Sequence, residues 1–197
     1  MLTKIAVALA ALTLAAASPT VLAQAKDSKD KQASSQAKKK DDLAKDDQKF
    51  WHDFAQANMA EVEAGKLAQQ QAKSEEVKKY GEHMVQDHSK MLEEQQTLAK
   101  SKGRQMPKEP SKHQQANMKK LQSAQGEQFD RAFMERMVKD HEHTLKLAQD
   151  ASKNAKDAEL KAMAAKAVPE IQKHLQMAKQ ISDKASAGAT AAPKKSK

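Results

Sequence analysis

Four polar residues interrupt the apolar stripes of this chain, one in each of four segments with helical periodicity. They are Glu61, His88, His141 and His174. Each lies near the middle of its stripe, so each is expected to be buried, where a carboxylate or an imidazole needs a bonding partner. One carboxylate and three imidazoles can form a closed hydrogen-bond network. Alternatively, they can supply one oxygen and three nitrogen ligands to a transition metal ion such as zinc, copper or iron.

Two of these histidines belong to a pattern that occurs twice. The segments 84–88 (MVQDH) and 137–141 (MVKDH) are each followed, four residues after the histidine, by a leucine. Met, His and Leu are therefore spaced i, i+4 and i+8, which places all three on one side of a helix. Asp87 and Asp140 precede the histidines and point about 100° away from them. Each aspartate could orient a histidine on a neighbouring helix, or it could form an interhelical ion pair.

The elements that must position these residues are four long helices, predicted at about 47–72, 74–100, 127–153 and 157–184. The first and last pairs are joined by only a few residues and so form antiparallel hairpins. Residues 101–126 connect the middle two helices and contain helix breakers at Gly103, Pro107 and Pro110. A connection this long can run back along the bundle. The sequence therefore predicts an all-α, ferritin-like four-helix bundle with one long crossover connection between helices two and three. In that arrangement the four polar residues lie within roughly two helical turns of one level.

The chain ends differ in character from this central part. Lys4 precedes an apolar run, and Val21-Leu22-Ala23 fits a cleavage site, so residues 1–23 are predicted to be a signal peptide. A retained membrane anchor is the alternative. Residues 24–47 are predicted to be a disordered charged linker, 48–184 the bundle, and 185–197 a disordered basic tail. The expected location is therefore periplasmic or secreted.

Composition narrows the classes of partner. The net charge is +9, but 35 Lys/Arg are mixed with 26 Asp/Glu, which is typical of solvated helix faces. Nucleic-acid binding is not expected, because the chain is predicted to be exported and only 3% of its residues are aromatic. The basic tail could contact a membrane or the cell wall weakly. The oligomeric state is not predicted.

Catalytic signatures are largely missing from the sequence. There is no Glu-x-x-His pair of the kind that di-iron bundles carry twice, no nucleophile elbow and no phosphate loop. The chain contains no cysteine, so disulfides and thiolate metal ligands are excluded. The sequence therefore favours a protein that is not an enzyme. A metal-dependent enzyme with an open coordination position is a third, weaker interpretation.

Several short sequence segments and single residues are similar to those of one protein family. They are the segments 58–61 (NMAE), 84–88 (MVQDH) and 137–141 (MVKDH), together with Gly65, Gly126, Phe129-Asp130, Pro169 and His174-Leu175. With these pieces the chain resembles the bacterial exported family called domain of unknown function four-one-four-two, over about residues 48–182. The resemblance implies a ferritin-like bundle and an exported location, and it implies no activity.

Together these features predict an exported helical bundle whose cluster of Glu61, His88, His141 and His174 binds a transition metal ion. A role in envelope metal handling or stress response would follow. The alternative is a structural or partner-binding bundle in which the cluster is only a hydrogen-bond network that fixes helix register.

Overall fold

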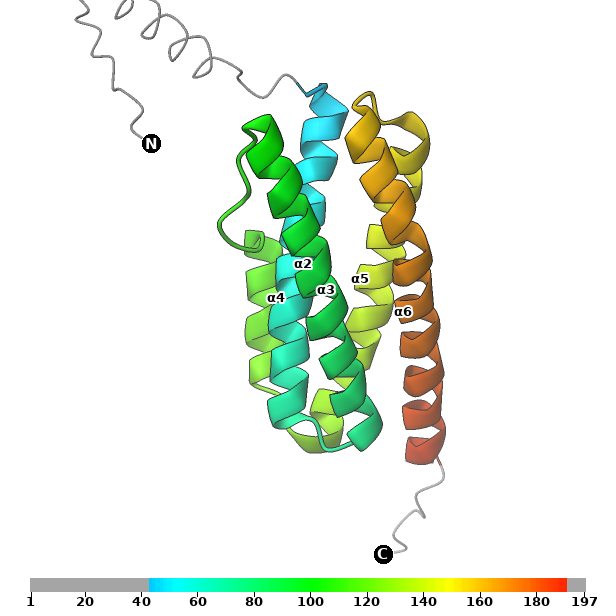
Figure 1. The fold of residues 1–197 in the computed structure, drawn as a ribbon. Coiled ribbons are helices and arrows are strands. Elements are labelled where there is room, and N and C mark those ends of the chain that lie inside the picture. The colour runs from blue at the N-terminus through cyan, green and yellow to red at the C-terminus, as the bar shows by residue number, and fades with distance from the viewer. Residues whose placement is uncertain (1–42, 191–197) are drawn as a thin grey trace, which may run out of the picture. The chain divides into compact units, whose positions relative to one another are not determined.

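The computed structural model describes residues 43–190 of the chain, with side chains up to residue 184 (Figure 1). Five α-helices and no strand occur among these residues, so this part of the chain is all-α. The helices are α2 (Lys45–Gln71), α3 (Glu75–Lys102), α4 (Lys112–Gln122), α5 (Gly126–Asn154) and α6 (Ala158–Thr190). The predicted signal peptide, most of the predicted linker and the last residues of the predicted tail lie outside the described residues.

Two helices extend past the predicted boundaries of the bundle. The helix α2 begins at Lys45, inside the segment predicted to be a linker, and Asp46 and Asp47 in its first turn are favourable for the helix dipole. The helix α6 ends at Thr190, six residues beyond the predicted end at 184. Residues 185–190 include three alanines, which have the highest helix propensity.

The long helices form two antiparallel hairpins, α2 with α3 and α5 with α6 (Figure 1). In the first hairpin the two backbones touch at a pair of glycines. A Cβ added to Gly65 would lie 2.5 Å from the carbonyl oxygen of Gly81. A Cβ added to Gly81 would lie 2.8 Å from the carbonyl oxygen of Gly65. Only glycine permits this approach, which brings the α2 and α3 polar residues close together.

The turn of each hairpin is held by an aspartate at the start of the other hairpin. Asp130 accepts hydrogen bonds from the backbone N–H groups of Lys73 (3.0 Å) and Ser74 (2.8 Å). Asp47 accepts the equivalent bonds from Lys156 (2.9 Å) and Asp157 (2.8 Å). The two hairpins are therefore joined by the same device used twice. In this way the backbone donors before α3 and α6 find partners.

Equivalent positions follow the two aspartates along their helices. Large buried side chains lie three, four and seven residues after each aspartate: Phe50, Trp51 and Phe54 in α2, and Phe133, Met134 and Met137 in α5. Eleven residues after each aspartate comes a buried polar side chain, Asn58 in α2 and His141 in α5. The helices α2 and α5 thus share one pattern, and both bring a polar group to the same height.

The connection between α3 and α5 is anchored to the bundle. Gly103 ends α3 with a positive φ of 68°, a conformation that suits glycine at a helix end. Shortly after it, the carbonyl oxygen of Gln105 accepts a 3.0 Å hydrogen bond from the indole N–H of Trp51, and the guanidinium of Arg104 lies over the Trp51 ring. Ser111 and Gln114 then form a capping box that starts α4. The helix α4 packs on α2 and α5, and in Figure 1 the chain returns through it so that α3 and α5 run in the same direction.

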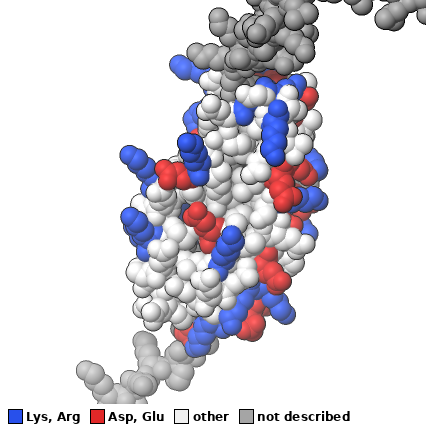
Figure 2. Space-filling view, turned by 60° about the vertical axis from the view of Figure 1, so that its left-hand side comes forward, with Lys and Arg blue, Asp and Glu red and all other residues white. Residues whose placement is uncertain are grey.

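The buried apolar side chains form two clusters, one in each half of the hairpins. One cluster contains Tyr80 and Phe133, and the other contains Trp51 and Ile171. Between them lies a layer of buried polar residues, each at most 4% exposed: Asn58, Glu61, His88, His141 and His174. The surface is charged with both signs, and Figure 2 shows Lys/Arg and Asp/Glu side chains interspersed on one face. No described helix has the length and hydropathy needed to cross a membrane.

Candidate metal centre

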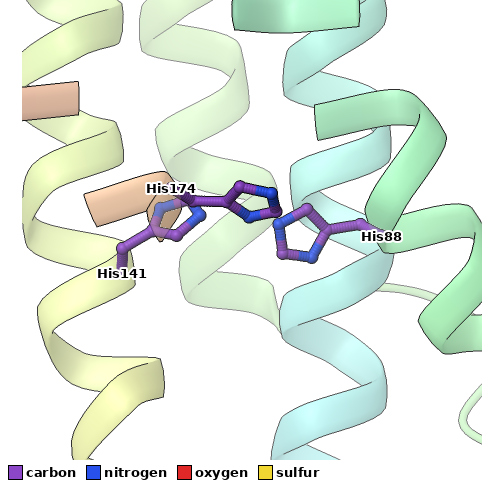
Figure 3. A group of neighbouring side chains, drawn as sticks. All are labelled: His88, His141 and His174. Carbon is purple, nitrogen blue, oxygen red and sulfur yellow. The ribbon is translucent and has the colours of Figure 1, made fainter. Parts of the chain in front are cut away.

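Three histidines meet in the polar layer, one each from α3, α5 and α6 (Figure 3). His88, His141 and His174 are each 1% exposed. Their ring centroids are 5.5 Å apart for His88–His141, 5.2 Å for His88–His174 and 5.5 Å for His141–His174. One ring nitrogen from each residue lies within 4.8 Å of the other two. The structure therefore brings together three of the four residues predicted as ligands.

Each imidazole ring is held by an oxygen on one of its two nitrogens. His88 Nδ1 lies 2.8 Å from Asn58 Oδ1, and His141 Nδ1 lies 2.8 Å from the carbonyl oxygen of Met137. His174 Nε2 lies 2.8 Å from Asp87 Oδ2. Carbonyl, amide and carboxylate oxygens accept hydrogen bonds, so these three nitrogens carry the ring protons and donate. The tautomer and orientation of every ring are therefore set from outside the cluster.

The second nitrogen of each ring has no hydrogen-bond partner among the described residues. These nitrogens are His88 Nε2, His141 Nε2 and His174 Nδ1, and all three are buried. A neutral imidazole whose proton is on one nitrogen presents a lone pair on the other. Three buried lone pairs have no donor to satisfy them, and burying such groups unpaired is costly. A Lewis acid shared by the three nitrogens removes that cost.

Glu61 lies beside the histidines and outside their group of donor atoms. Its Oε1 is 3.9 Å from His141 Nδ1, which is too long for a hydrogen bond, and that nitrogen already donates to Met137. The other oxygen, Oε2, is buried and has no partner among the described residues. Glu61 also lines a cavity of about 470 Å³ between α2, α4 and α5. The closed Glu/His hydrogen-bond network considered from the sequence is therefore not formed by these side chains.

Comparison with known proteins identifies the family of this chain. A model of the family "domain of unknown function (DUF4142)" matches residues 31–181. The chain belongs to the DUF4142 family. This confirms the family predicted from the sequence motifs. No curated protein matches the DUF4142 chain in sequence.

One solved structure resembles this DUF4142 domain in fold. It is a protein from Streptomyces coelicolor that its description assigns to DUF305 and calls secreted. The TM-score is 0.62 at 15% sequence identity, and the match covers 72% of the DUF4142 chain and 92% of the other chain. At this identity the likeness concerns the fold alone, and it supports an all-helical architecture.

Burial keeps all three DUF4142 histidines neutral near pH 7. It lowers the pKa of His88 well below the usual 6.5, and the neighbouring His141 and His174 lower it further. Burial, with a contribution from His174, lowers the pKa of His141 to about 4. Burial also lowers the pKa of His174, although the Asp87 carboxylate opposes this effect. Neutral imidazoles are the form that binds metal ions.

Burial has the opposite effect on the protonation of Glu61. It raises the pKa of this carboxyl well above its usual 4.5, with a further increase from Asp140 and a partial opposition from Arg136. Arg136 is itself paired with Asp140 on α5. The raised pKa favours the protonated form of Glu61 beside three neutral imidazoles, and a positive charge nearby would favour its carboxylate form.

Two neighbours of the histidines were not singled out from the sequence. Asn58 is fully buried, and its side-chain oxygen orients His88. The hydroxyl of Tyr80 donates to the backbone oxygen of His174 at 3.3 Å, and the Tyr80 ring lies edge-on to His141. Asn58 falls three residues before Glu61, on the same helix face, and this spacing was the available signal. For Asp87, the orienting role considered from the sequence is the one found, since it accepts from His174 on α6.

Proposed function

We propose that His88, His141 and His174 bind one transition metal ion, and that the protein is an exported, non-enzymatic DUF4142 bundle that handles metal in the bacterial envelope. The observation that carries this proposal is the convergence of three buried histidines, each of which has one unpartnered ring nitrogen. Each ring donates its other N–H to an oxygen, as metal-ligating histidines commonly do. Zinc, copper and iron all accept a set of imidazole ligands.

A metal ion would set the separations of the three ligating nitrogens. Nitrogen ligands sit about 2.0–2.1 Å from zinc, so three nitrogens around one ion are roughly 3.3 Å apart in a tetrahedral site. One nitrogen of each ring lies within 4.8 Å of the other two, so small rotations of the rings suffice to reach that separation. Three histidines leave a fourth position, for which we propose Glu61. Its unpartnered oxygen can turn toward the ion, and its negative charge would offset part of the ion's charge.

The finer architecture also belongs to this proposal. We interpret the fold as a ferritin-like four-helix bundle with one long crossover, in which α4 forms part of the connection from α3 to α5. Two short hairpin turns and the common direction of α3 and α5 in Figure 1 support this interpretation. Export is supported by the apolar N-terminal run that ends in Val21-Leu22-Ala23.

Metal content tests the proposal directly. The mature chain is purified without a histidine tag, supplied with micromolar zinc, copper(II) or cobalt(II), and analysed for bound metal. We expect about one ion per chain and a metal-dependent rise in melting temperature. Both should disappear in His141→Ala. In the matched control, His83→Ala, an exposed histidine of α3 is removed, and metal binding should persist. A wild-type chain that binds no metal, or equal binding by wild type and His141→Ala, would contradict the proposal.

The alternative is that the polar layer only fixes the register of the helices. It is favoured by two hydrogen bonds that cross between helices, His88 to Asn58 and His174 to Asp87. It leaves the three lone pairs and Glu61 Oε2 without a role. This interpretation predicts that His141→Ala changes stability equally with and without added metal.

A further inference from the structure

A groove between α3 and α6 leads from the surface to Asp87, a neighbour of the histidine cluster. It holds a cavity of about 210 Å³ whose lining includes Asp87, Met91, Glu94, Met163, Lys166 and Glu170. Asp87 is hydrogen-bonded to His174, so one residue of the groove lining contacts one of the three histidines. A small ion bound at Asp87 in this groove would be next to His174, one of the three histidines of the centre.

Asp87, Glu170 and His174 form a second group of metal-binding side chains. One donor atom from each lies within 4.8 Å of the other two. Their exposure decreases inward: Glu170 is exposed, the Asp87 side chain is 32% exposed and His174 is 1% exposed. Two carboxylates and one imidazole are ligands that divalent transition metals accept. The group is thus open to solvent at one end and to the core at the other.

His174 belongs to both groups of ligands. Its Nε2 faces Asp87, whereas its Nδ1 is one of the three unpartnered nitrogens of the inner cluster. A neutral imidazole has one proton and one lone pair, so it can ligate through only one nitrogen at a time. An ion held by Nε2 in the outer group and an ion held by Nδ1 in the inner cluster therefore exclude each other. Such sharing suits a transient outer position better than a second permanent one.

We propose that the α3/α6 groove is the loading route of the centre, and that Asp87, Glu170 and His174 take up a divalent transition metal ion and pass it to the three histidines. This proposal rests on the metal site proposed above. The ion exchanges the two carboxylates for His88 and His141 as it moves inward. His174 remains close throughout: its ring proton is on Nδ1 while Nε2 is a ligand, and on transfer Nδ1 releases this proton as it binds the ion while Nε2 takes up a proton from water in the groove and donates to Asp87 again. The route requires no large movement of a helix.

The grouping of ligand atoms favours this side over the opposite one. Three carboxylates, those of Asp87, Glu94 and Glu170, line the groove together with Lys90 and Lys166, and Glu94 is paired with Lys166. On the opposite side, between α2 and α5, Glu61 lies next to Nδ1 of His141. That nitrogen donates to Met137, and Glu61 is not grouped with a histidine nitrogen and a second carboxylate as Asp87 and Glu170 are grouped with His174. The groove between α3 and α6 ends at a histidine whose inner nitrogen is available.

Binding kinetics of cobalt(II) in the Glu170→Gln variant test the route. Glu170 is exposed and belongs to the outer group alone, so its substitution should leave folding intact. We expect the association and dissociation rates to fall by the same factor, about threefold to tenfold, while Kd stays unchanged. A transient binding position lowers the barrier between the free ion and the inner site, and it does not change the free energy of either state. The control is Glu82→Gln, which removes the same charge from an exposed position on α3.

Measurement at high salt separates contact from long-range attraction. Surface charge steering is screened within about 3 Å at 1 M salt, so an effect of Glu170→Gln that survives there requires direct ligation. Wild-type rates in Glu170→Gln, an effect that vanishes at high salt, or a weaker Kd at an unchanged association rate would each overturn the route and leave the inner site standing. A wild-type chain that binds no cobalt(II) would overturn both proposals.

Discussion

At the scale of single residues, the centre depends on side chains that orient the rings as much as on the rings themselves. The hydrogen-bond partner of each imidazole occupies one ring nitrogen and so decides which nitrogen is left to bind a metal ion. The remaining nitrogen is Nε2 in His88 and His141, and Nδ1 in His174. Two of the three partners are side chains that can be replaced, Asn58 and Asp87. The third is the backbone oxygen of Met137, which no substitution removes.

Asn58→Leu tests this orienting role. Leucine has the same number and branching of side-chain heavy atoms as asparagine, so the core stays filled, but His88 loses its acceptor and the ring is free to turn. We expect the affinity for zinc or cobalt(II) to fall by about 10–100-fold. The measurement is a metal titration against a competing chelator. Asn117→Leu serves as the control because its partner, His113, is exposed. Unchanged affinity in Asn58→Leu would show that the other ligands suffice to hold His88 in place.

The sequence predicted the positions of the three histidines because helical periodicity depends only on spacing. His88, His141 and His174 each occupy a stripe position, and all three are buried at one level as expected. The periodicity could not reveal which nitrogen of each ring would face inward, since this depends on atoms from neighbouring helices. Asn58 was noted only as part of the family segment 58–61, because a buried amide carries no distinctive chemistry until its partner is known.

At the scale of helices, the two copies of the repeated pattern have different surroundings. Asp87 of the first copy accepts from His174 on another helix, whereas Asp140 of the second copy pairs with Arg136 on its own helix. The positions with equivalent surroundings are Asp47 in α2 and Asp130 in α5. Each aspartate accepts hydrogen bonds from the turn of the hairpin to which it does not belong. The sequence did not predict this role of Asp47, because it sits in a charged run that resembled a linker.

The glycine contact between α2 and α3 yields a prediction at this scale. In Gly65→Ala the new methyl group would lie 2.5 Å from the Gly81 carbonyl oxygen, so the two backbones must move apart. We expect a loss of about 1–3 kcal/mol in the free energy of unfolding, of the size seen for overpacked cores. Urea denaturation followed by circular dichroism measures it. Gln70→Ala, at an exposed position of the same helix, should change stability by less than about 0.5 kcal/mol. Equal stability of Gly65→Ala and wild type would show that the helices separate at little cost.

At the scale of the whole molecule, the polar layer divides the buried apolar side chains into two clusters. A protein selected only for stability would fill this layer with apolar side chains, since buried polar groups seldom stabilise more than a well-packed apolar replacement. The bundle instead carries three neutral imidazoles and a carboxyl with a raised pKa at its centre. The cost of that layer is a reason to assign it a binding role.

The same layer predicts how the stability of the metal-free protein depends on pH. The pKa of His141 is about 4 in the folded protein and 6.5 in its usual state, and those of His88 and His174 are also lowered. Between about pH 6.5 and pH 4 the unfolded chain therefore binds more protons at these residues, so the folded state loses stability as the pH falls. For His141 alone the loss is on the order of 3 kcal/mol.

Glu61 acts in the opposite direction, which gives the prediction its control. Its pKa is raised by folding, so above about pH 4.5 the folded state binds more protons at Glu61, and acidification through this range favours folding. Glu61→Gln removes that compensation and should make the acid loss of the free energy of unfolding steeper, whereas His141→Gln should make it shallower. Urea denaturation of metal-free protein at pH 7.5, 6 and 5 measures the three slopes. If the slopes of wild type and His141→Gln were identical, the imidazole at the centre of the bundle would be protonated as readily as one in water, and its burial would not lower its pKa.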